Sequence, residues 1–197
     1  IKIFLNIKPS LEKDKIFYNI SQDKKVLTLL NNITLDDPKK TKKIELNKIF
    51  SHNDENSYIY EEIMLNCVKN SIEGENFTFI SYGDSNSEKH NLIIGSQDCY
   101  ENIANRGLLP RLLESYINKI NSNNVLVDTI SLNISYILIN NNNYIDLSQL
   151  VGKDSKILNK IDKEELIKNY SKDINNQNIL KNVKKCQIKK ANDSLYS

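Results

Sequence analysis

The feature that most constrains this chain is a short apolar run that ends at a glycine and precedes a strongly periodic helix. Residues 77–82 read F-T-F-I-S-Y, an aromatic and β-branched run typical of a central strand, and Gly83 ends it. Between residues 108 and 120, large apolar side chains recur three and four positions apart, which is the spacing of one helix face. The sequence therefore predicts strand, loop and helix over 77–120, an order typical of α/β proteins.

The loop in this unit has the outline of a phosphate-binding loop. That motif, G-x-x-x-x-G-K-[ST], uses glycines so that backbone amides approach phosphate oxygens, a lysine for the outer phosphates and a hydroxyl for Mg²⁺. Gly83 and Lys89 stand at the required spacing, whereas Glu88 takes the second glycine position and His90 the hydroxyl position. Taken alone, this string is too degenerate to assign a nucleotide site, and Lys89 can equally be one of many solvated lysines.

Six short strings in a fixed order make the assignment more specific. The loop resembles the kinesin string F-A-Y-G-Q-T-G-S-G-K-T, and residues 107–111, G-L-L-P-R, resemble the G-I-I-P-R that opens the next helix. The other four are I-K-I-F-L-N-I-K-P at 1–9, K-I-F at 48–50, Y-E-E-I at 60–63, and S-Y-I-L-I-N-N with a later D-L within 135–147. The chain thus resembles the N-terminal portion of a kinesin motor domain.

The resemblance implies an α/β fold, a kinesin-type P-loop NTPase-like sandwich. We expect a central, mostly β-sheet flanked by helices, incomplete at the C-terminal side, with residues 1–197 forming a single motor-like domain. Asn56 or Ser57 is expected to cap the helix over 57–72, with Glu61 and Glu62 near its positive end. Further strands are expected near 3–7, 25–30, 33–35, 43–50, 125–139 and 144–147, a helix near 163–170, and a strand or hairpin within 179–188.

The resemblance also assigns residues to a degenerate nucleotide site. These residues are Gly83, Ser85, Ser87, Lys89 and His90 of the loop, with Lys8 and Pro9 near the end of the first strand. In kinesins the arginines of R-x-R-P help to cradle the adenine, and here Asn6 and Lys8 replace them. Lysine is not a planar stacking group, so base recognition is weakened. No catalytic residue and no metal ligand are expected.

Two substitutions oppose phosphate and metal binding. Glu88 adds a side chain and a negative charge where backbone should meet phosphate, and like charges about 4 Å apart repel by about 4 kcal/mol near a protein surface. Its φ angle must also suit the loop. His90 cannot replace threonine as an oxygen ligand for Mg²⁺. The switch strings N-x-x-S-S-R-S-H and D-L-A-G-S-E are absent from the sequence, so we expect little or no ATP hydrolysis, with ATP and Mg²⁺ as cofactors only for an active motor.

Composition narrows the remaining classes. A net charge of +2 argues against a dedicated nucleic-acid binder. No apolar run reaches the length of a membrane helix. The three widely spaced residues Cys67, Cys99 and Cys186 predict free thiols in a reducing, cytoplasmic setting.

Three functions fit these observations. The first is a non-catalytic, microtubule-associated kinesin-like module of the cytoskeleton, which acts as a scaffold or as the partner of a catalytic kinesin subunit. The second is the N-terminal part of an active, divergent ATP-driven motor, which requires switch motifs beyond Ser197. The third is a structural interaction domain that binds neither nucleotide nor tubulin.

Overall fold

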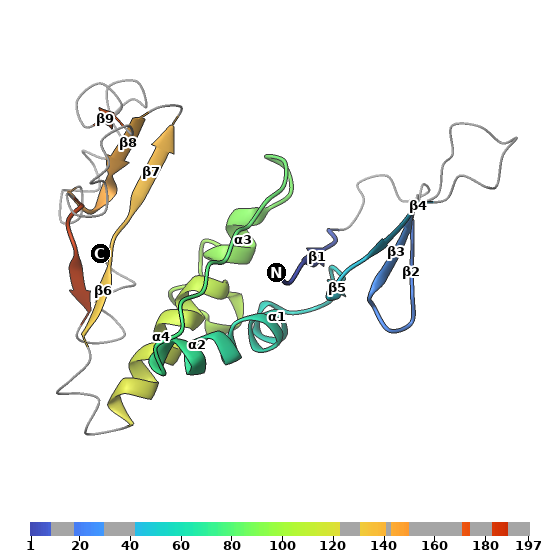
Figure 1. The fold of residues 1–197 in the computed structure, drawn as a ribbon, viewed down its shortest axis with the longest axis horizontal. Helices are drawn as coiled ribbons and strands as arrows, with labels where there is room; N and C mark the ends of the chain where they lie inside the picture. Colours follow the sequence, from blue (N-terminus) through green and yellow to red (C-terminus); the bar gives the residue numbers. More distant parts are fainter. Residues whose placement is uncertain are drawn as a thin grey trace, which may run out of the picture. The chain divides into compact units, whose positions relative to one another are not determined.

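The computed structural model describes residues 1–8, 18–29, 42–122, 131–140, 143–149, 171–173 and 183–188. The chain divides into two compact units, Ile1–Leu112 and Leu113–Ser197, and each is described by itself (Figure 1). Helix α4 (Leu108–Asn121) begins in the first unit and continues into the second. Within the described ranges, no helix is long and apolar enough to cross a membrane.

The strands of the first unit form two small sheets. In the first sheet β1 and β5 run in parallel, with Leu5 opposite Ile49. In the second, β3 lies between β2 and β4, and both pairings are antiparallel. The strand predicted over 43–50 is two strands, because Leu46 N donates to Lys25 O and Asn47 N donates to Ile3 O. The strands are β1 (Phe4–Asn6), β2 (Tyr18–Ile20), β3 (Val26–Leu29), β4 (Lys42–Glu45) and β5 (Lys48–Phe50).

The helix predicted over 57–72 is divided at Met64 into two helices. Met64 has φ −103° and ψ −28°, yet its amide still bonds to Tyr60 O and its carbonyl accepts from Val68 N, so the two pieces follow one another closely. The helices of the first unit, with one 3₁₀ turn, are α1 (Asn56–Ile63), α2 (Leu65–Ile72), α3 (Lys89–Ile93) and η1 (Ile103–Asn105).

The start of α1 differs from the prediction. Glu55 occupies the N-cap position, and no side chain caps the helix. The Asn56 side chain instead donates to Asn91 O at 3.2 Å, and the Ser57 hydroxyl donates to Glu55. The first turn of α1 contains no acidic residue, since Glu62 lies near the helix end, where it accepts from Lys48. The predicted charge–dipole support from the two glutamates is therefore wrong.

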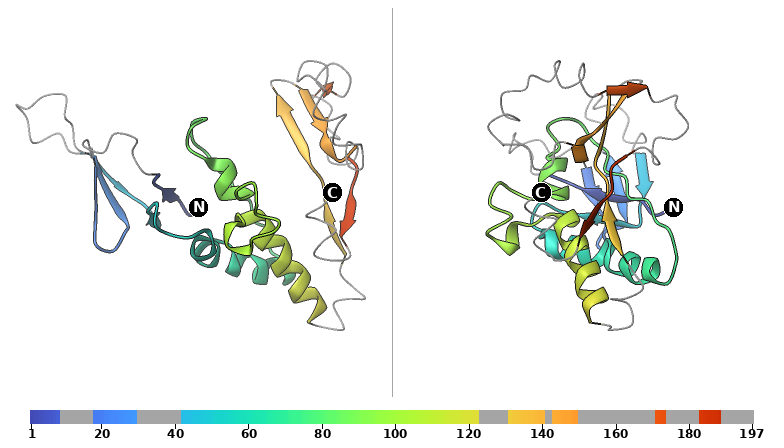
Figure 2. Two further views of the ribbon diagram at one scale, coloured as in Figure 1. Left: turned by 180° about the vertical axis from the view of Figure 1, so that it is seen from behind. Right: turned by 90° about the vertical axis from the view of Figure 1, so that its left-hand side faces the viewer.

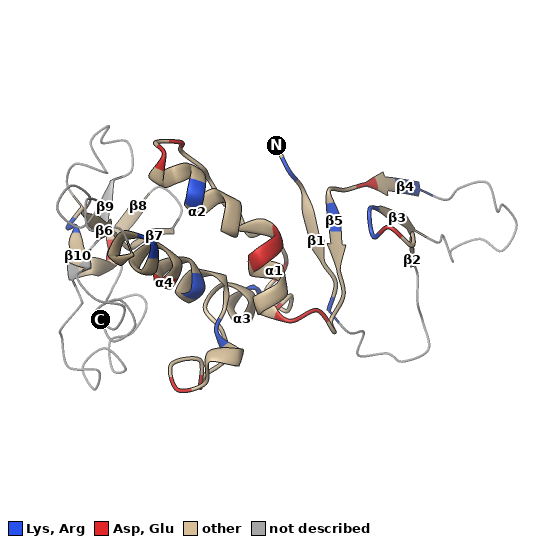
Figure 3. Ribbon diagram, turned by 90° about the horizontal axis from the view of Figure 1, so that it is seen from below, with Lys and Arg blue, Asp and Glu red and all other residues tan. Residues whose placement is uncertain are grey.

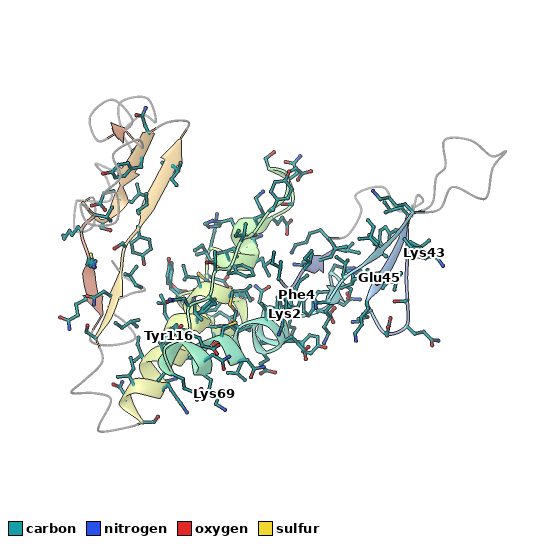
Figure 4. The ribbon with its side chains drawn as sticks, in the orientation of Figure 1. Lys2, Phe4, Lys43, Glu45, Lys69 and Tyr116 are labelled. Carbon is teal, nitrogen blue, oxygen red and sulfur yellow. The ribbon has the colours of Figure 1, made fainter. Side chains whose placement is uncertain are left out.

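One apolar cluster holds the first unit together. The ring of Phe4, which Figure 4 labels, lies 6.3 Å from the ring of Phe50. Tyr58 meets Phe50 edge-on at 6.0 Å. Because the cluster draws on β1, β5, α1, α3 and the start of α4, it fixes these elements relative to one another. Its buried members are Phe50, Ile59, Tyr60, Met64 and Leu108, with Phe4, Ile63, Leu92, Ile93 and Leu112 packed around them.

The central strand predicted over 77–82 is not formed. These residues carry no strand, and the ribbon from α2 to α3 is drawn without an arrow (Figures 1 and 2). All residues from 73 to 82 are exposed, so the segment lacks both ladder and core contacts. A strand exists only by pairing, and no described strand lies against this one.

The second unit contains two further small sheets and one 3₁₀ turn. β6 pairs with β10, and β8 pairs with both β7 and β9, with every pairing antiparallel. The strand predicted over 125–139 breaks at Ser135, whose hydroxyl donates to Lys184 O, and at Tyr136, whose amide donates to Ser148 Oγ. The elements are β6 (Leu132–Ile134), β7 (Ile137–Asn140), β8 (Asn143–Asp146), η2 (Leu147–Gln149), β9 (Ser171–Asp173) and β10 (Cys186–Ile188).

Some predictions cannot be compared with the structure. The predicted strand near 33–35, the predicted helix near 163–170 and Pro9 lie outside the described residues. Among the residues that are described, the strands form four separate sheets instead of the single predicted central sheet. The segment expected at the centre of that sheet, 77–82, is the one left unpaired.

Candidate functional site

The predicted loop lies between the unpaired segment 77–82 and helix α3. Leu92 and Ile93 of α3 pack on the apolar cluster, and the Asn56 side chain bonds to the Asn91 carbonyl from α1. These contacts anchor the helix that follows the loop. Two acidic residues, Asp84 and Glu88, belong to this loop, and Figure 3 colours the acidic residues of the described chain red.

The Lys89 ammonium is held by the loop itself. Its Nζ donates to Gly83 O at 2.9 Å, to Ser87 Oγ at 3.2 Å and to the carbonyl of Asp84. The Ser87 hydroxyl donates to the Asp84 carbonyl at 2.8 Å, which closes the turn. The loop therefore presents oxygen acceptors to its own cation, whereas a phosphate site presents amide donors to an anion.

Gly83 lies in the tightest part of this turn. A Cβ added at Gly83 would lie 2.6 Å from Ser87 Oγ, so a side chain there would displace the hydroxyl that closes the loop. Gly83, Ser87 and Lys89 thus come together as the sequence predicts, although what they bind in this structure is one another.

Glu88 adopts the backbone conformation that the motif reserves for glycine. Its φ of 53° and ψ of 32° are left-handed, a region that L-residues other than glycine, asparagine and aspartate rarely occupy. The carboxylate faces Lys8, whose Nζ lies 3.4 Å from Glu88 Oε2. Residue 88 thus keeps a glycine-like backbone, and its carboxylate lies beside Lys8, which stands at a predicted base-cradle position.

The other predicted site residues lie outside this cluster. Ser85 and His90 are exposed, and within the described part of the chain neither side chain has a hydrogen bond. Pro9 lies outside the described residues. The structure therefore brings Lys8, Gly83, Ser87 and Lys89 to one place, and it leaves Ser85 and His90 facing solvent.

Sequence reasoning treated Glu88 only as an obstacle and missed its ion pair. The signal was present in the sequence. The resemblance places Lys8, at the base-cradle position, and Glu88, at the second glycine position, around one ligand, and their charges are opposite. Glu88 lies near Lys8 and at the end of the loop that encloses Lys89, so its charge balances the local cations.

The string G-L-L-P-R has a structural explanation. A Cβ on Gly107 would lie 2.5 Å from the backbone of Ile93, and Gly107 N donates to Ile94 O at 2.9 Å. The Arg111 guanidinium donates to Ile103 O at 2.8 Å and to Arg106 O at 3.2 Å. The Gly107 contacts hold the end of α3 against the start of α4. The Arg111 bonds hold η1 against α4, so the motif positions the helix that follows the loop.

The site does not fit a magnesium nucleotide. Lys89 is bound to the carbonyls of its own loop, and Glu88 places a carboxylate at the second glycine position, so both oppose the phosphate anions. His90 places an imidazole at the hydroxyl position, where Mg²⁺ requires an oxygen ligand. Helix α3 has only five residues, so its dipole adds little. Among the described residues, no group of three or more acidic, histidine or cysteine side chains is placed to hold a metal ion, and the three cysteines are free thiols.

Comparison with known proteins gives consistent matches. The family model of the kinesin motor domain matches residues 7–196. Kinesin-like protein KIF9 of Mus musculus is 30% identical over 96 residues, which is 49% of this chain and 12% of that protein. Kinesin-like protein KIN-1 of Arabidopsis thaliana is 32% identical over 81 residues, which is 40% of this chain and 17% of that protein.

A solved structure of a fast kinesin is similar in fold. It matches with a TM-score of 0.68 at 15% identity, and the match covers 98% of this chain and 50% of that chain. At this identity the likeness is one of fold alone. The chain therefore corresponds to about half of the solved kinesin and to a small part of the two relatives.

Proposed function

This chain belongs to the kinesin motor domain family, and from that premise we propose that it is a microtubule-associated module with a degenerate, non-catalytic nucleotide site. Kinesin motor domains bind microtubules in general and act on the cytoskeleton. The observation that carries the proposal is the occupied loop, in which the Lys89 ammonium is bound by Gly83 O, Asp84 O and Ser87 Oγ.

Binding of a nucleotide phosphate would require the Lys89 ammonium to break its bonds within the loop. To reach an outer phosphate, Lys89 must leave three oxygen acceptors, and each hydrogen bond to a charged group is worth about 1.5–3 kcal/mol. The incoming anion would then meet the Glu88 carboxylate, whose partner Lys8 is only half-buried. Both effects oppose the nucleotide, and neither is offset by a hydroxyl ligand for Mg²⁺ at position 90.

The remaining parts of the proposal follow from the family. We propose that the two compact units belong to one motor-like domain and that the protein resides in the cytoplasm on the cytoskeleton. Its partners are tubulin and, where it serves as the inactive half of a pair, a catalytic kinesin subunit.

Titration with a fluorescent ATP analogue tests the nucleotide half of the proposal. We expect no saturable, Mg²⁺-dependent signal in the micromolar range with the chain itself. The double variant Glu88→Gly and His90→Thr restores the glycine and the hydroxyl, and it should gain measurable affinity. Micromolar Mg²⁺-dependent binding by the unaltered chain would contradict the proposal.

Co-sedimentation tests the microtubule half. We expect the chain to pellet with taxol-stabilised microtubules and the pelleted fraction to fall as salt rises, because tubulin presents an acidic surface. Retention in the supernatant at low salt would favour a structural domain that has lost both ligands.

One observation favours the alternative of an active divergent motor. Glu88 keeps the left-handed backbone of a glycine, so the loop's path survives the substitution. Under this alternative the gene sequence beyond Ser197 encodes both switch motifs, and the complete protein hydrolyses ATP faster when microtubules are added. Absence of those motifs would exclude it.

A further inference from the structure

The ion pair between Lys8 and Glu88 joins two parts of the first unit that are far apart in the sequence. Lys8 follows β1, and Glu88 immediately precedes α3. The charged atoms lie 3.4 Å apart, and the two side chains are 34% and 57% exposed. Exposed pairs of this kind add little to stability, so stability alone is a poor reason for a carboxylate at position 88.

Glu88 also holds a backbone conformation that disfavours it. Its φ of 53° and ψ of 32° lie in the left-handed region, which glutamate rarely adopts. Strained residues cluster at functional sites, and an observed outlier is a reason to look for a function. The function to look for at Glu88 is one that its side chain performs, because glycine would satisfy the backbone without strain.

Both members of the pair start from fixed backbone. Ile7 N donates to Phe50 O at 2.9 Å, which ties the residue before Lys8 to β5. Leu92 N donates to Glu88 O at 3.3 Å, and Leu92 packs on the apolar cluster. The folded unit therefore brings the two attachment points together, and the contact does not depend on a loose loop.

Lys8 is the second cation that the structure brings to the loop. The first, the Lys89 ammonium, is already bound by loop oxygens. The resemblance assigns Lys8 to the base, yet the 3.4 Å contact shows that its ammonium reaches the residue at the second glycine position. Carboxylate and phosphate oxygens are both charged acceptors for an ammonium group, so Glu88 takes a place on Lys8 that a phosphate oxygen could take.

We propose that Glu88 is a tethered anion that occupies Lys8 and competes for this cation with the phosphate chain of an external ligand. Lys8 is then the residue through which the loop would bind a phosphate chain once Glu88 is neutralised. The inference rests on the proposed function and adds to it that Glu88 acts by pairing with Lys8 as well as by repulsion. Because the competitor is tethered, its effective concentration is high and constant.

A double-mutant cycle with inorganic tripolyphosphate tests the proposal on the whole chain. The probe is titrated at low salt without Mg²⁺ into the unaltered chain, Glu88→Gln, Lys8→Met and the double variant, and calorimetry or phosphorus NMR gives each association constant. Glu88→Gln should tighten binding in the presence of Lys8. This gain should exceed the gain in the Lys8→Met background by about two- to fivefold, the range expected for an exposed ion pair.

The cycle separates competition from repulsion. Equal gains in the two backgrounds would show that Glu88 acts through its charge alone, and no gain from Glu88→Gln would show that it does not exclude the anion. Either result overturns the proposal. Because the cycle uses neither Mg²⁺ nor a nucleotide, it can fail while the proposed function stands, and Mg²⁺-dependent ATP binding by the unaltered chain would contradict the proposed function alone.

A matched control removes a lysine elsewhere in the same segment. Lys2→Met deletes an exposed cation before β1 and should preserve the gain from Glu88→Gln. Loss of the gain in this control would show that total positive charge, and not Lys8, attracts the probe, and would overturn the proposal. All of these variants should unfold near the temperature of the unaltered chain, because no substituted side chain belongs to the buried core.

Discussion

Replacing Glu88 with glycine tests whether the loop holds a strained backbone. At φ 53° and ψ 32° a non-glycine residue carries about 1–2 kcal/mol of steric cost, which glycine removes. Glycine gains about 0.5–1 kcal/mol of extra freedom in the unfolded chain. The ion pair, which joins a half-buried Lys8 to an exposed Glu88, is worth about 0.2–1 kcal/mol. Glu88→Gly should therefore change the free energy of unfolding by no more than about 1 kcal/mol in either direction.

The matched control is Glu88→Ala, which loses the same ion pair but keeps the left-handed strain. Because the ion-pair loss cancels, the glycine variant should exceed the alanine variant by about 1 kcal/mol, or about 2–4 °C in Tm for a chain of this size. Thermal and urea denaturation followed by circular dichroism measure both. If the alanine variant is as stable as the glycine variant, residue 88 does not hold the left-handed conformation, and the argument that the loop keeps its glycine path fails.

Three further substitutions test the packing and charge of the first unit. Gly107→Ala forces a Cβ to within 2.5 Å of Ile93 and should cost about 2 kcal/mol or more by urea denaturation, whereas Gly74→Ala, with open space around it, should cost only its backbone strain. Phe50→Ala removes a buried ring and should cost about 3–5 kcal/mol, enough to leave the chain unfolded or nearly so by circular dichroism. Hydrogen bonds from the Ser96 hydroxyl and then from Asn105 hold the pKa of Asp98 below its ordinary 3.8. Its stabilisation is therefore present above pH 3.8 and is lost as pH falls through the folded pKa. The urea midpoints of Asp98→Asn and the unaltered chain should accordingly converge as the pH falls below 3.8, and a gap independent of pH would contradict this.

The spacing of apolar residues in the sequence correctly predicted those helices and strands whose buried face is set by that local spacing. The apolar stripe over 108–120 became α4, and the alternation near Ile3 and Ile7 became β1. The failures share one cause, which is dependence on distant partners. Asn47 and Ser135 each end a predicted strand because they bond to backbone far away in the sequence, from Asn47 to Ile3 and from Ser135 to Lys184. Alternation of side chains carries no information about such contacts.

The same limit explains how much of the candidate site could be predicted from sequence. Spacing alone brought Gly83, Ser87 and Lys89 together, because a short loop before a helix leaves little freedom. The direction of the Lys89 ammonium and the pairing of Glu88 with Lys8 depend on charge balance within the folded unit, which no motif encodes. The prediction of a strand at 77–82 is wrong, because the pairing partner that a strand requires is not among the described residues.

The loop and the unpaired segment are physically linked, since Gly83 directly follows Tyr82. A segment without ladder bonds cannot fix the position of the loop's first residue, so the Lys89 bonds to Gly83 and Asp84 and the Lys8–Glu88 pair are what hold the loop closed. Lys89→Met should therefore lower the protection of amides 83–88 against hydrogen–deuterium exchange, because it removes the bonds from Nζ to the carbonyls of Gly83 and Asp84. Unchanged protection of these amides in the variant would show that the loop closes without the Lys89 bonds.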